Sequence, residues 1–320
     1  MMKKKWMTAF FAILFVLGLS LTASAADYPK EPVQLLIPFG AGGSADFLGR
    51  ALANAAEKYL GQPIVPVNRP GAGGGIMYNA LKNSKPNGYT LGWCSTGILT
   101  VTDIGNVPFK WDAFDYACRI GYSGLPIAVR ADAPWKTFKE FVDYVKKNPG
   151  KVKIGNAGTG SATHVAAIVI EKDLGLQMIH VPLGAERRIP SLLGGEMDAI
   201  CVPLPEIAAQ VQAGKARLLV IPSENRDPDY PNVPTCKELG YNIVIDLWRG
   251  ISTPKGTPDN VLKKIEEAFK KGTEDPKFRE ISKKNSFIIS FMDRPQFEKY
   301  VKEQDVIMAK VMEEAGLKKK

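Results

Sequence analysis

The sequence predicts an α/β protein of two facing lobes, each a mostly parallel sheet flanked by helices. The first observation is a buried strand, a glycine-rich turn and a helix start over residues 33–52. The second is a β-α-β-α-β rhythm that continues to residue 94, which is typical of a parallel sheet covered by helices. The third is another strand, glycine-serine turn and helix over residues 152–170. Because ligands of such sheets lie at the carboxyl ends of the strands, we expect the two lobes to face each other across a cleft.

The composition is that of a globular protein large enough for two domains. The chain has 320 residues, of which 45% are hydrophobic and 23% charged. Residues 1–25 supply three of its 42 basic residues and no acid, so the remainder keeps a surplus of only six positive charges over its 33 acids. Many lysines lie beside glutamates in amphipathic C-terminal segments, which indicates a solvated face and no nucleic-acid partner.

The N-terminus predicts a secretory signal peptide. Three lysines at 3–5 precede an apolar run at 7–21, and Ala23-Ser24-Ala25 fits the A-x-A cleavage pattern. A transmembrane anchor is the alternative, but the run falls short of the about 20 residues that a span needs. We expect cleavage after Ala25 and an exported, periplasmic protein if the source is Gram-negative.

Cysteines and histidines do not predict a metal site. The even count of four cysteines permits disulfides in an oxidising compartment, but their pairing cannot be read from the sequence. The apolar surroundings of Cys94 and Cys201 favour buried thiols. The two histidines, His164 and His180, lack neighbours at metal-ligand spacing, so we expect neither a metal nor a cofactor.

The first glycine-rich turn is a candidate anion site. It passes from Pro38 through Gly40 and Gly43 to Ser44 and Asp46, both natural N-cap residues. The first N–H groups of a helix lack partners, and glycine lets a ligand approach them. The turn matches neither nucleotide-binding glycine pattern and has no lysine, so a carboxylate is favoured over a phosphate. An ordinary tight connection remains the alternative.

The rest of the first half supplies the predicted sheet and its covering helices. Its elements are a helix to residue 59, a strand at 64–67, a second glycine-rich turn at 68–75, a helix at 76–83, a strand at 89–94 and a looser region at 100–122. Ser95 and Thr96 follow the last strand and are expected at its carboxyl end, beside the glycine turns.

The second half repeats the pattern. Its elements are a strand at 125–129, a helix at 138–145, a strand at 152–155, the glycine-serine turn at 156–164, a helix at 165–170, a strand at 178–181, a loop at 182–188 before a short helix, a strand at 218–221, strand-like runs at 243–245 and 248–252, and amphipathic helices at 260–271 and 294–314. We expect these last helices to pack on the first lobe. Arg187 and Arg188 are candidates for bidentate pairing with a carboxylate, or else surface arginines.

An ordered set of short motifs runs through nearly the whole chain after the signal peptide. They are Ile37-Pro38-Phe39 with Gly42-Gly43-Ser44-x-Asp46, Gly61-Gln62-Pro63, Val67-Asn68-Arg69-Pro70-Gly71-Ala72-Gly73-Gly74, Pro86-Asn87-Gly88-Tyr89-Thr90-Leu91, Asn148-Pro149-Gly150-Lys151, Gly158-x-Gly160-Ser161 with His164, His180-Val181-Pro182, Leu193-Gly194-Gly195 with Asp198, Val233-Pro234-Thr235, Trp248-x-Gly250 and Pro254-x-Gly256-Thr257-Pro258. In this set the chain resembles the Bug (TctC-like) family, the solute-binding proteins of the tripartite tricarboxylate transporter system.

The resemblance implies a type II periplasmic-binding-protein (Venus flytrap) fold. Lobe 1 would comprise residues 26–125 plus 246–320, and lobe 2 residues 126–245. The protein would be a monomer that captures a small carboxylate-bearing molecule and delivers it to the permease subunits in the membrane.

The resemblance places the ligand between the two glycine loops. The matching positions are Ala41, Gly42, Gly43, Ser44 and Asp46 in one lobe and Thr159, Gly160, Ser161, Thr163 and His164 in the other. The further candidate binding residues are Phe39, Ser95, Thr96, Gly184, Ala185, Arg187 and Asp198. We expect Asp46 to cap the helix or to meet an amino or hydroxyl group of the ligand, Asp198 to orient a loop, and His164 to pack and cap.

One departure bears on the ligand. After the His-Val-Pro motif the family usually has an aromatic residue and a glycine pair, whereas this chain has Leu183-Gly184-Ala185-Glu186-Arg187-Arg188. The extra arginines predict a more highly charged ligand, or one unlike the usual dicarboxylates.

Two other functions share the same loops. An exported enzyme acting on an anionic substrate is disfavoured because neither Ser44 nor Ser161 lies in a G-x-S-x-G motif, so no catalytic residue is assigned. An exported ligand sensor for a membrane kinase would use the same cleft and differ only in its partner.

Overall fold

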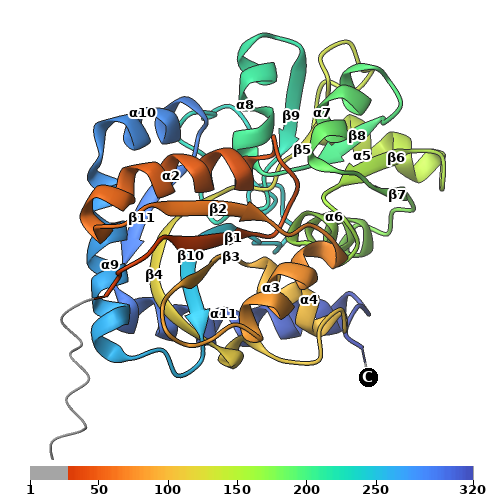
Figure 1. Cartoon of the computed structure of the whole chain (residues 1–320). Coiled ribbons are helices and arrows are strands. Elements are labelled where there is room, and N and C mark those ends of the chain that lie inside the picture. The colour runs from red at the N-terminus through yellow and green to blue at the C-terminus, as the bar shows by residue number, and fades with distance from the viewer. Residues whose placement is uncertain (1–27, 320) are drawn as a thin grey trace, which may run out of the picture.

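The computed structural model describes residues 28–319, and these form two lobes that each contain one sheet (Figure 1). The predicted signal peptide and its cleavage site lie outside the described residues.

The sheet of the first lobe has six strands in the order β11-β4-β10-β3-β1-β2. The strands are β1 (Val33–Ile37), β2 (Ile64–Asn68), β3 (Thr90–Ser95), β4 (Phe114–Ser123), β10 (Leu247–Pro254) and β11 (Ile288–Met292). Strand β1 pairs in parallel with β2 and β3, whereas β10 pairs antiparallel with β3 and β4, and β11 pairs antiparallel with β4.

The sheet of the second lobe has five strands in the order β7-β6-β8-β5-β9. The strands are β5 (Ile127–Arg130), β6 (Lys153–Asn156), β7 (Ile179–Pro182), β8 (Ala199–Cys201) and β9 (Ala216–Val220). Strand β6 pairs in parallel with β7 and β8, and β5 pairs antiparallel with β8 and β9.

The two-lobed α/β fold is confirmed, but both sheets are mixed where the sequence predicted mostly parallel ones. Parallel pairing occurs where a helix connects two strands of one lobe. The antiparallel pairs involve the strands at which the chain changes lobe. Strand β4 runs toward the second lobe and β10 returns from it alongside, so Leu247 lies opposite Ser123. Strands β5 and β9 are related in the same way in the second lobe.

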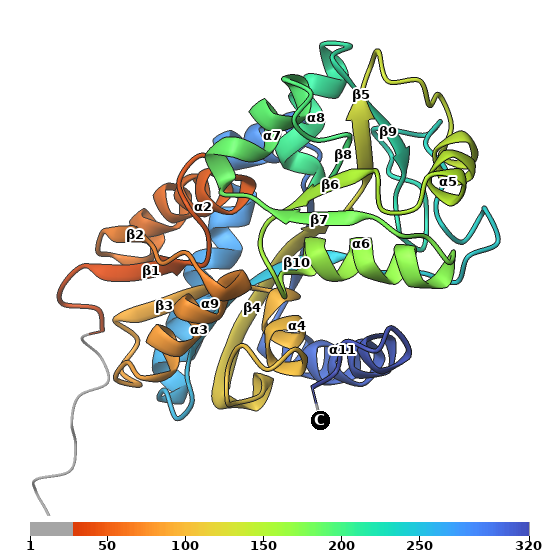
Figure 2. The same ribbon diagram turned by 90° about the vertical axis from the view of Figure 1, so that its right-hand side faces the viewer.

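Helices cover both sheets. They are α2 (Ser44–Leu60), α3 (Gly75–Lys82), α4 (Gly97–Asp103), α5 (Phe138–Lys147), α6 (Ala162–Asp173), α7 (Ala185–Leu193), α8 (Leu204–Gln212), α9 (Asp259–Glu274), α10 (Pro276–Lys284) and α11 (Arg294–Glu314). Helix α9 packs on α2, and α11 packs on β4 and α4. The predicted return of the C-terminal helices to the first lobe is thereby confirmed (Figure 2). Within residues 28–319, no helix is long and apolar enough to cross a bilayer.

Local sequence explains where several helices begin and end. Helix α2 ends where Gly61 adopts a left-handed conformation with φ of 94°. Helix α5 begins at a capping box, in which the Thr137 hydroxyl accepts from the Glu140 N–H and the Glu140 side chain accepts in return. Helix α11 begins with the same device at Asp293 and Gln296.

The looser region predicted at 100–122 is instead well ordered. It contains most of α4 and the long central strand β4, which is buried along most of its length. Asp115 and Arg119 concealed this strand from a hydropathy pattern. Arg119 is only 7% exposed, and its guanidinium donates to the backbone and side chain of Ser290. The run at 243–245 is buried at both ends but does not belong to either sheet.

The four cysteines are buried free thiols, as the sequence favoured. They are Cys94 in β3, Cys118 in β4, Cys201 in β8 and Cys236 in the connection between β9 and β10. Burial raises the pKa of the Cys94 thiol to about 12, so this sulfur stays protonated at neutral pH.

Candidate ligand-binding cleft

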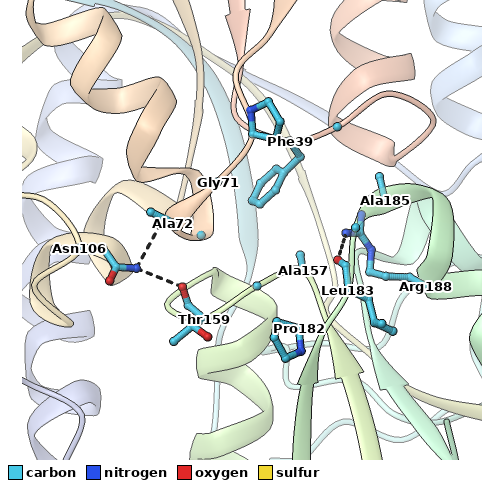
Figure 3. A pocket seen from close by; sticks show the side chains of 15 residues that line it. Phe39, Gly71, Ala72, Asn106, Ala157, Thr159, Pro182, Leu183, Ala185 and Arg188 are labelled. Atoms are coloured by element: carbon cyan, nitrogen blue, oxygen red, sulfur yellow. Dashed lines mark hydrogen bonds between the residues drawn. The ribbon is translucent and has the colours of Figure 1, made fainter. Parts of the chain in front are cut away.

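A cleft of about 480 Å³ lies between the lobes, and we call it the outer cleft (Figure 3). It is formed by the loops at the carboxyl ends of strands from both sheets. The first lobe contributes Phe39, Gly40, Pro70, Gly71, Ala72, Gly73 and Asn106, and the second contributes Ala157, Gly158, Thr159, Pro182, Leu183, Gly184, Ala185 and Arg188. The volume is within the range of small-molecule sites.

A smaller space of about 20 Å³, the inner chamber, adjoins the outer cleft. The two spaces share Phe39, Ala157 and Arg188. The chamber is completed by Ser44, Ala45, Ser95, Gly97, Ser161, Ala162, Thr163, Pro203, Glu206, Leu247 and Arg249. Its volume is that of about one or two water-sized groups, and it lies where the N-termini of α2 and α6 approach each other from opposite lobes.

The loops of the two lobes touch directly. The Thr100 hydroxyl of α4 donates to the Gly160 carbonyl at 2.7 Å. The Asn106 amide donates to carbonyls of both lobes, at Ala72 and Thr159, each at 3.1 Å (Figure 3). Gly73 has φ of 64°, and a Cβ there would lie 2.6 Å from the Thr159 oxygen. The loops of the two lobes are therefore in direct contact in this structure.

In the first loop, Asp46 holds the turn and does not face the cleft. One carboxylate oxygen accepts from the Gly42 N–H at 3.1 Å. The other accepts from the Arg50 Nε at 2.8 Å and the Asn68 amide at 2.9 Å. The neighbouring Ser44 is 1% exposed, and its hydroxyl lines the chamber with no hydrogen-bond partner among the described residues.

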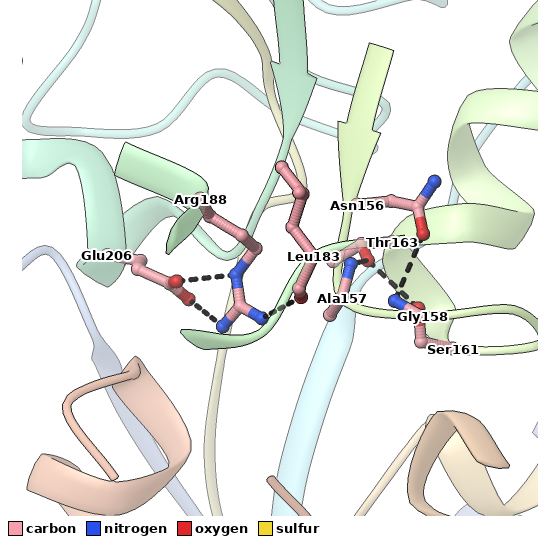
Figure 4. Close-up of polar contacts among 8 residues, drawn as sticks. All are labelled: Asn156, Ala157, Gly158, Ser161, Thr163, Leu183, Arg188 and Glu206. Atoms are coloured by element: carbon pink, nitrogen blue, oxygen red, sulfur yellow. Dashed lines mark hydrogen bonds and ion pairs between the residues drawn. The ribbon is translucent and has the colours of Figure 1, made fainter. Parts of the chain in front are cut away.

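In the second loop, hydroxyls fix the start of α6 (Figure 4). The Ser161 hydroxyl caps the helix by accepting from the His164 N–H at 3.3 Å. The Thr163 hydroxyl accepts from the Ala157 N–H at 2.9 Å and lies 3.0 Å from that of Ser161. His164 Nδ1 accepts from the Gly160 N–H at 3.2 Å. Burial, with a smaller contribution from the nearby His180, lowers the pKa of His164 to about 4, so its ring is neutral at pH 7.

Arg188 is buried but its charge is compensated. Its Nε and Nη2 donate to the two carboxylate oxygens of Glu206 on α8, at 2.7 and 3.0 Å, and its Nη1 donates to the Leu183 carbonyl at 3.1 Å (Figure 4). The two side chains are 3% and 4% exposed. This bidentate pair fixes α7 to α8 within the second lobe.

Arg249 is buried and its charge is not compensated by a direct partner. It lies on β10, is 2% exposed, and lines the inner chamber. Among residues 28–319 its guanidinium donates no hydrogen bond and forms no ion pair, and Nη1 is fully buried. The guanidinium carbon lies 5.7 Å from the centre of the Trp93 ring. Burial lowers the pKa of Arg249 to about 10, which still leaves it charged at neutral pH.

Several predicted site residues come together around the two spaces. Phe39, Thr159, Gly184 and Ala185 line the outer cleft, while Ser44, Ser95, Ser161 and Thr163 line the inner chamber. Gly43 lies between the lobes, since a Cβ there would be 3.0 Å from both Ala185 Cβ and Arg188 Nη2. Gly160 contributes an interlobe hydrogen-bond acceptor.

Other predicted residues hold the scaffold. Arg187 is exposed and pairs with Glu196 at 3.1 Å, because α7 begins at Ala185 and turns this side chain outward. Asp198 accepts from the Lys153 N–H at 2.8 Å, at the end of β6 far from the cleft loops.

Three more predicted residues lie near the cleft without lining either space. The Thr96 hydroxyl donates to the Asp246 carbonyl at 2.8 Å and accepts from the Trp248 N–H at 3.1 Å, so it fixes the returning chain. Ala41 is exposed on the first loop, and His164 supports the second loop from behind.

Glu206 and Arg249 are chamber residues that sequence reasoning missed. An arginine inside the apolar run at 247–252 was an available signal, because an unpaired charge in a buried strand is rare. Glu206 gave no comparable signal. Among the described residues, no group of three or more His, Cys, Asp or Glu side chains could hold a metal ion.

Comparisons with known proteins show which family the chain belongs to. Residues 48–317 match the model of the tripartite tricarboxylate transporter family receptor. The chain is 33% identical over 312 residues to the UPF0065 protein in the gbd 5' region of Cupriavidus necator, covering 96% of this chain and 94% of that one. The solved periplasmic binding protein BugD is 30% identical, with a TM-score of 0.87, and the match covers 92% of this chain and all of that one.

A second similar structure was solved with a ligand. It is MatC from Rhodopseudomonas palustris with bound malate, which is 25% identical with a TM-score of 0.78, over 90% of this chain and 98% of that one. The family model spans most of the chain, and the similarity to the Cupriavidus protein extends over nearly its whole length. The chain therefore belongs to the TctC (Bug) family of periplasmic solute-binding proteins, the receptors of the tripartite tricarboxylate transporter system.

Proposed function

We propose that this protein captures a small organic acid between its lobes and delivers it to the permease of a tripartite tricarboxylate-type transporter. The observation that carries the proposal is the buried, positively charged inner chamber at the meeting point of two helix N-termini. Unpaired N–H groups and a guanidinium both favour an anion. The malate bound to the similar MatC supports a carboxylate as that anion.

The same geometry supports binding without chemistry. Among the described residues, no serine hydroxyl is hydrogen-bonded to a histidine ring, and the Nδ1 acceptor of His164 already serves the Gly160 N–H. A nucleophile needs an adjacent base within hydrogen-bond reach. The hydroxyls of Ser161 and Thr163 instead cap a helix and brace a loop.

The proposal includes export and lobe movement. The mature protein would begin after Ala25 and act in the periplasm as a monomer. The part from 126 to 245 would move against the part formed by 26–125 and 246–320 when the ligand binds. Mass spectrometry of the secreted protein tests the cleavage site, and its mass in solution tests the monomer.

Calorimetry tests capture directly. We expect at least one organic acid from a panel of mono-, di- and tricarboxylates to release heat on binding and to raise the melting temperature. A ligand at about 100 times its Kd stabilises the folded state by roughly 2.7 kcal/mol. Neutral amides of the same skeletons serve as controls. If no acid in the panel binds, capture of a carboxylate is wrong.

Uptake tests delivery. Cells that carry the permease should accumulate the radiolabelled acid only when this protein is present in their periplasm. Accumulation that is independent of the protein would contradict delivery while leaving capture intact.

A further inference from the structure

We infer that the inner chamber receives a single carboxylate anchored by Arg249 and that the outer cleft receives an uncharged body, so that the ligand class is monocarboxylates. This inference rests on the proposed function, because it names the substrate class of the same cleft. It concerns Arg249, a residue outside the two glycine loops.

Of the charged side chains that line the chamber, one cation has no carboxylate partner and could pair with the ligand. Its charged lining residues are Arg188, Glu206 and Arg249. Arg188 and Glu206 neutralise each other at 2.7 Å and keep their hydrogen bonds within the second lobe. Arg249 alone keeps an unsatisfied guanidinium at 2% exposure. A buried charge without a partner is strongly unfavourable, and one carboxylate would both neutralise it and accept its hydrogen bonds.

A second unpartnered donor belongs to a residue that lines the same chamber. The Ser44 hydroxyl is 1% exposed, lines the same chamber, and has no hydrogen-bond partner among the described residues. Two buried donors from different elements, β10 and the start of α2, therefore lie unsatisfied around one space. The space of about 20 Å³ holds about one or two water-sized groups, which suits a carboxylate head and excludes a whole solute.

The described residues of the outer cleft provide no unpaired cationic side chain that could bind a second carboxylate. Among residues 28–319, the only charged residue that lines it is Arg188, which is already paired with Glu206. Much of the remaining wall consists of apolar side chains, including Phe39, Pro182 and Leu183 (Figure 3). Pro70 also lines it. The carboxylate of Glu186 lies at the rim, 3.9 Å from where a Gly40 Cβ would be. This negative charge repels a second anionic group and favours an uncharged body.

The extra arginines of the chain therefore do not call for a more highly charged ligand. Arg187 is 61% exposed and paired with Glu196 outside the cleft, and Arg188 is neutralised by Glu206. Arg249 and the apolar wall of the outer cleft together are what favour a monocarboxylate over the usual dicarboxylates.

Matched acids test the class. The probes are straight-chain monocarboxylates of four to eight carbons, benzoate and phenylacetate, each measured against its dicarboxylate of the same skeleton and against its neutral amide. We expect at least one monocarboxylate to bind at least tenfold more tightly than both of its counterparts in titration calorimetry. A dicarboxylate that binds as tightly as its monocarboxylate, or more tightly, overturns the inference.

Variants of Arg249 test the anchor with the best-binding acid. Arg249→Met keeps the unbranched apolar stem of the side chain and removes the charged guanidinium, and we expect it to weaken binding on the order of 10- to 100-fold, the loss typical of a charge-assisted hydrogen bond. Arg249→Lys keeps the charge and should restore part of that loss. Arg279→Met makes the same change in net charge on exposed α10 and should leave the Kd unchanged.

The two proposals fail in different ways. Wild-type affinity in Arg249→Met overturns the anchor while capture of an acid stands. Absence of binding by every acid to the wild-type protein removes the capture itself. A loss of fold in Arg249→Met would also count against the inference, because removing an unpaired buried charge should maintain or raise the melting temperature; the comparison of acid with amide on the wild-type protein does not depend on that variant.

Discussion

Two buried arginines that line one small chamber have different roles because of their partners. Arg188 meets a carboxylate of its own lobe in a bidentate geometry, so its charge serves the structure. Arg249 comes from the other lobe and meets no acceptor. Burial removes the hydrating water from both guanidinium groups. The difference between them lies in which protein groups compensate that loss. The unsatisfied guanidinium is the one that is free for a ligand.

The Arg188–Glu206 pair should be important for stability. Removing Glu206 leaves a buried cation without its partner, and we expect Glu206→Ala to lower the free energy of unfolding by about 3–5 kcal/mol. Urea denaturation at pH 7 measures this. The control is Glu196→Ala, since its pair with Arg187 has side chains 59% and 61% exposed and should cost less than about 1 kcal/mol. Equal losses in both variants would contradict a stabilising buried pair.

His164 should make the fold sensitive to acid. Its pKa is lowered to about 4 in the folded protein, from an ordinary value of 6.5, so the unfolded chain binds its proton first. Its contribution to stability is therefore complete above pH 6.5 and is lost as the pH falls toward 4. We expect the wild-type protein to lose more stability than His164→Gln between pH 7 and pH 4.5 in urea denaturation. Parallel curves would show that the ring does not titrate as described.

At the scale of elements, β4 and β10 connect the lobes. They lie side by side as the second and third strands of the six-stranded sheet, one leading into the second lobe and one returning. The segment just before β10 includes Asp246, whose backbone is held by Thr96 and whose Oδ1 is buried without a partner. The connection between the lobes thus contains a carboxyl group, that of Asp246, whose ionised form is disfavoured by burial.

Asp246→Asn should stabilise the protein at neutral and higher pH. Burial raises the pKa of Asp246 to about 6 from an ordinary 3.8, so ionisation destabilises the fold as the pH rises through this range. The neutral amide avoids that cost, and we expect a gain on the order of 1–3 kcal/mol at pH 8 that disappears below pH 4. Urea denaturation at the two pH values checks it. A gain that is independent of pH would have another cause.

At Gly43, the backbone of the first loop would accept a larger side chain, but the facing second lobe leaves no room for one. Gly43 has φ of −82°, which any residue adopts, yet a Cβ there would crowd Ala185 and Arg188 at 3.0 Å. We expect Gly43→Val to weaken ligand binding at least 100-fold in calorimetry, with little change in melting temperature. The matched control is Ala209→Val on an exposed face of α8, which should bind normally. Normal binding by Gly43→Val would remove this loop from the site.

The elements that sequence predicts best are those with strong local signals. The helix at 294–314 is found with the predicted bounds because a capping box begins it and Gly316 follows its end. Strand β4 escaped notice because Arg119 is satisfied by Ser290, which is 171 residues away. Local periodicity cannot indicate such a partner.

At the scale of the whole molecule, the sequence predicts which loops form the candidate site. It does not predict which charged side chains of that site are paired. The two glycine loops predict where a ligand would lie, since each combines a strand end with a helix start. The compensation of Arg188 by Glu206 and the isolation of Arg249 arise only when α7, α8 and β10 meet around one space. Those contacts join distant parts of the chain, so the sequence alone left open a more highly charged ligand or one unlike the usual dicarboxylates.

The burial of all four native cysteines makes the molecule convenient for labelling. A cysteine placed on the exposed first loop by Ala41→Cys would be the one thiol open to a maleimide dye, since each native sulfur is enclosed and protonated. The dye would sit next to Gly40 at the rim, where approach of the second lobe changes its surroundings. Its fluorescence would then follow opening and closing in real time, turning the protein into an optical sensor for whichever acid it carries.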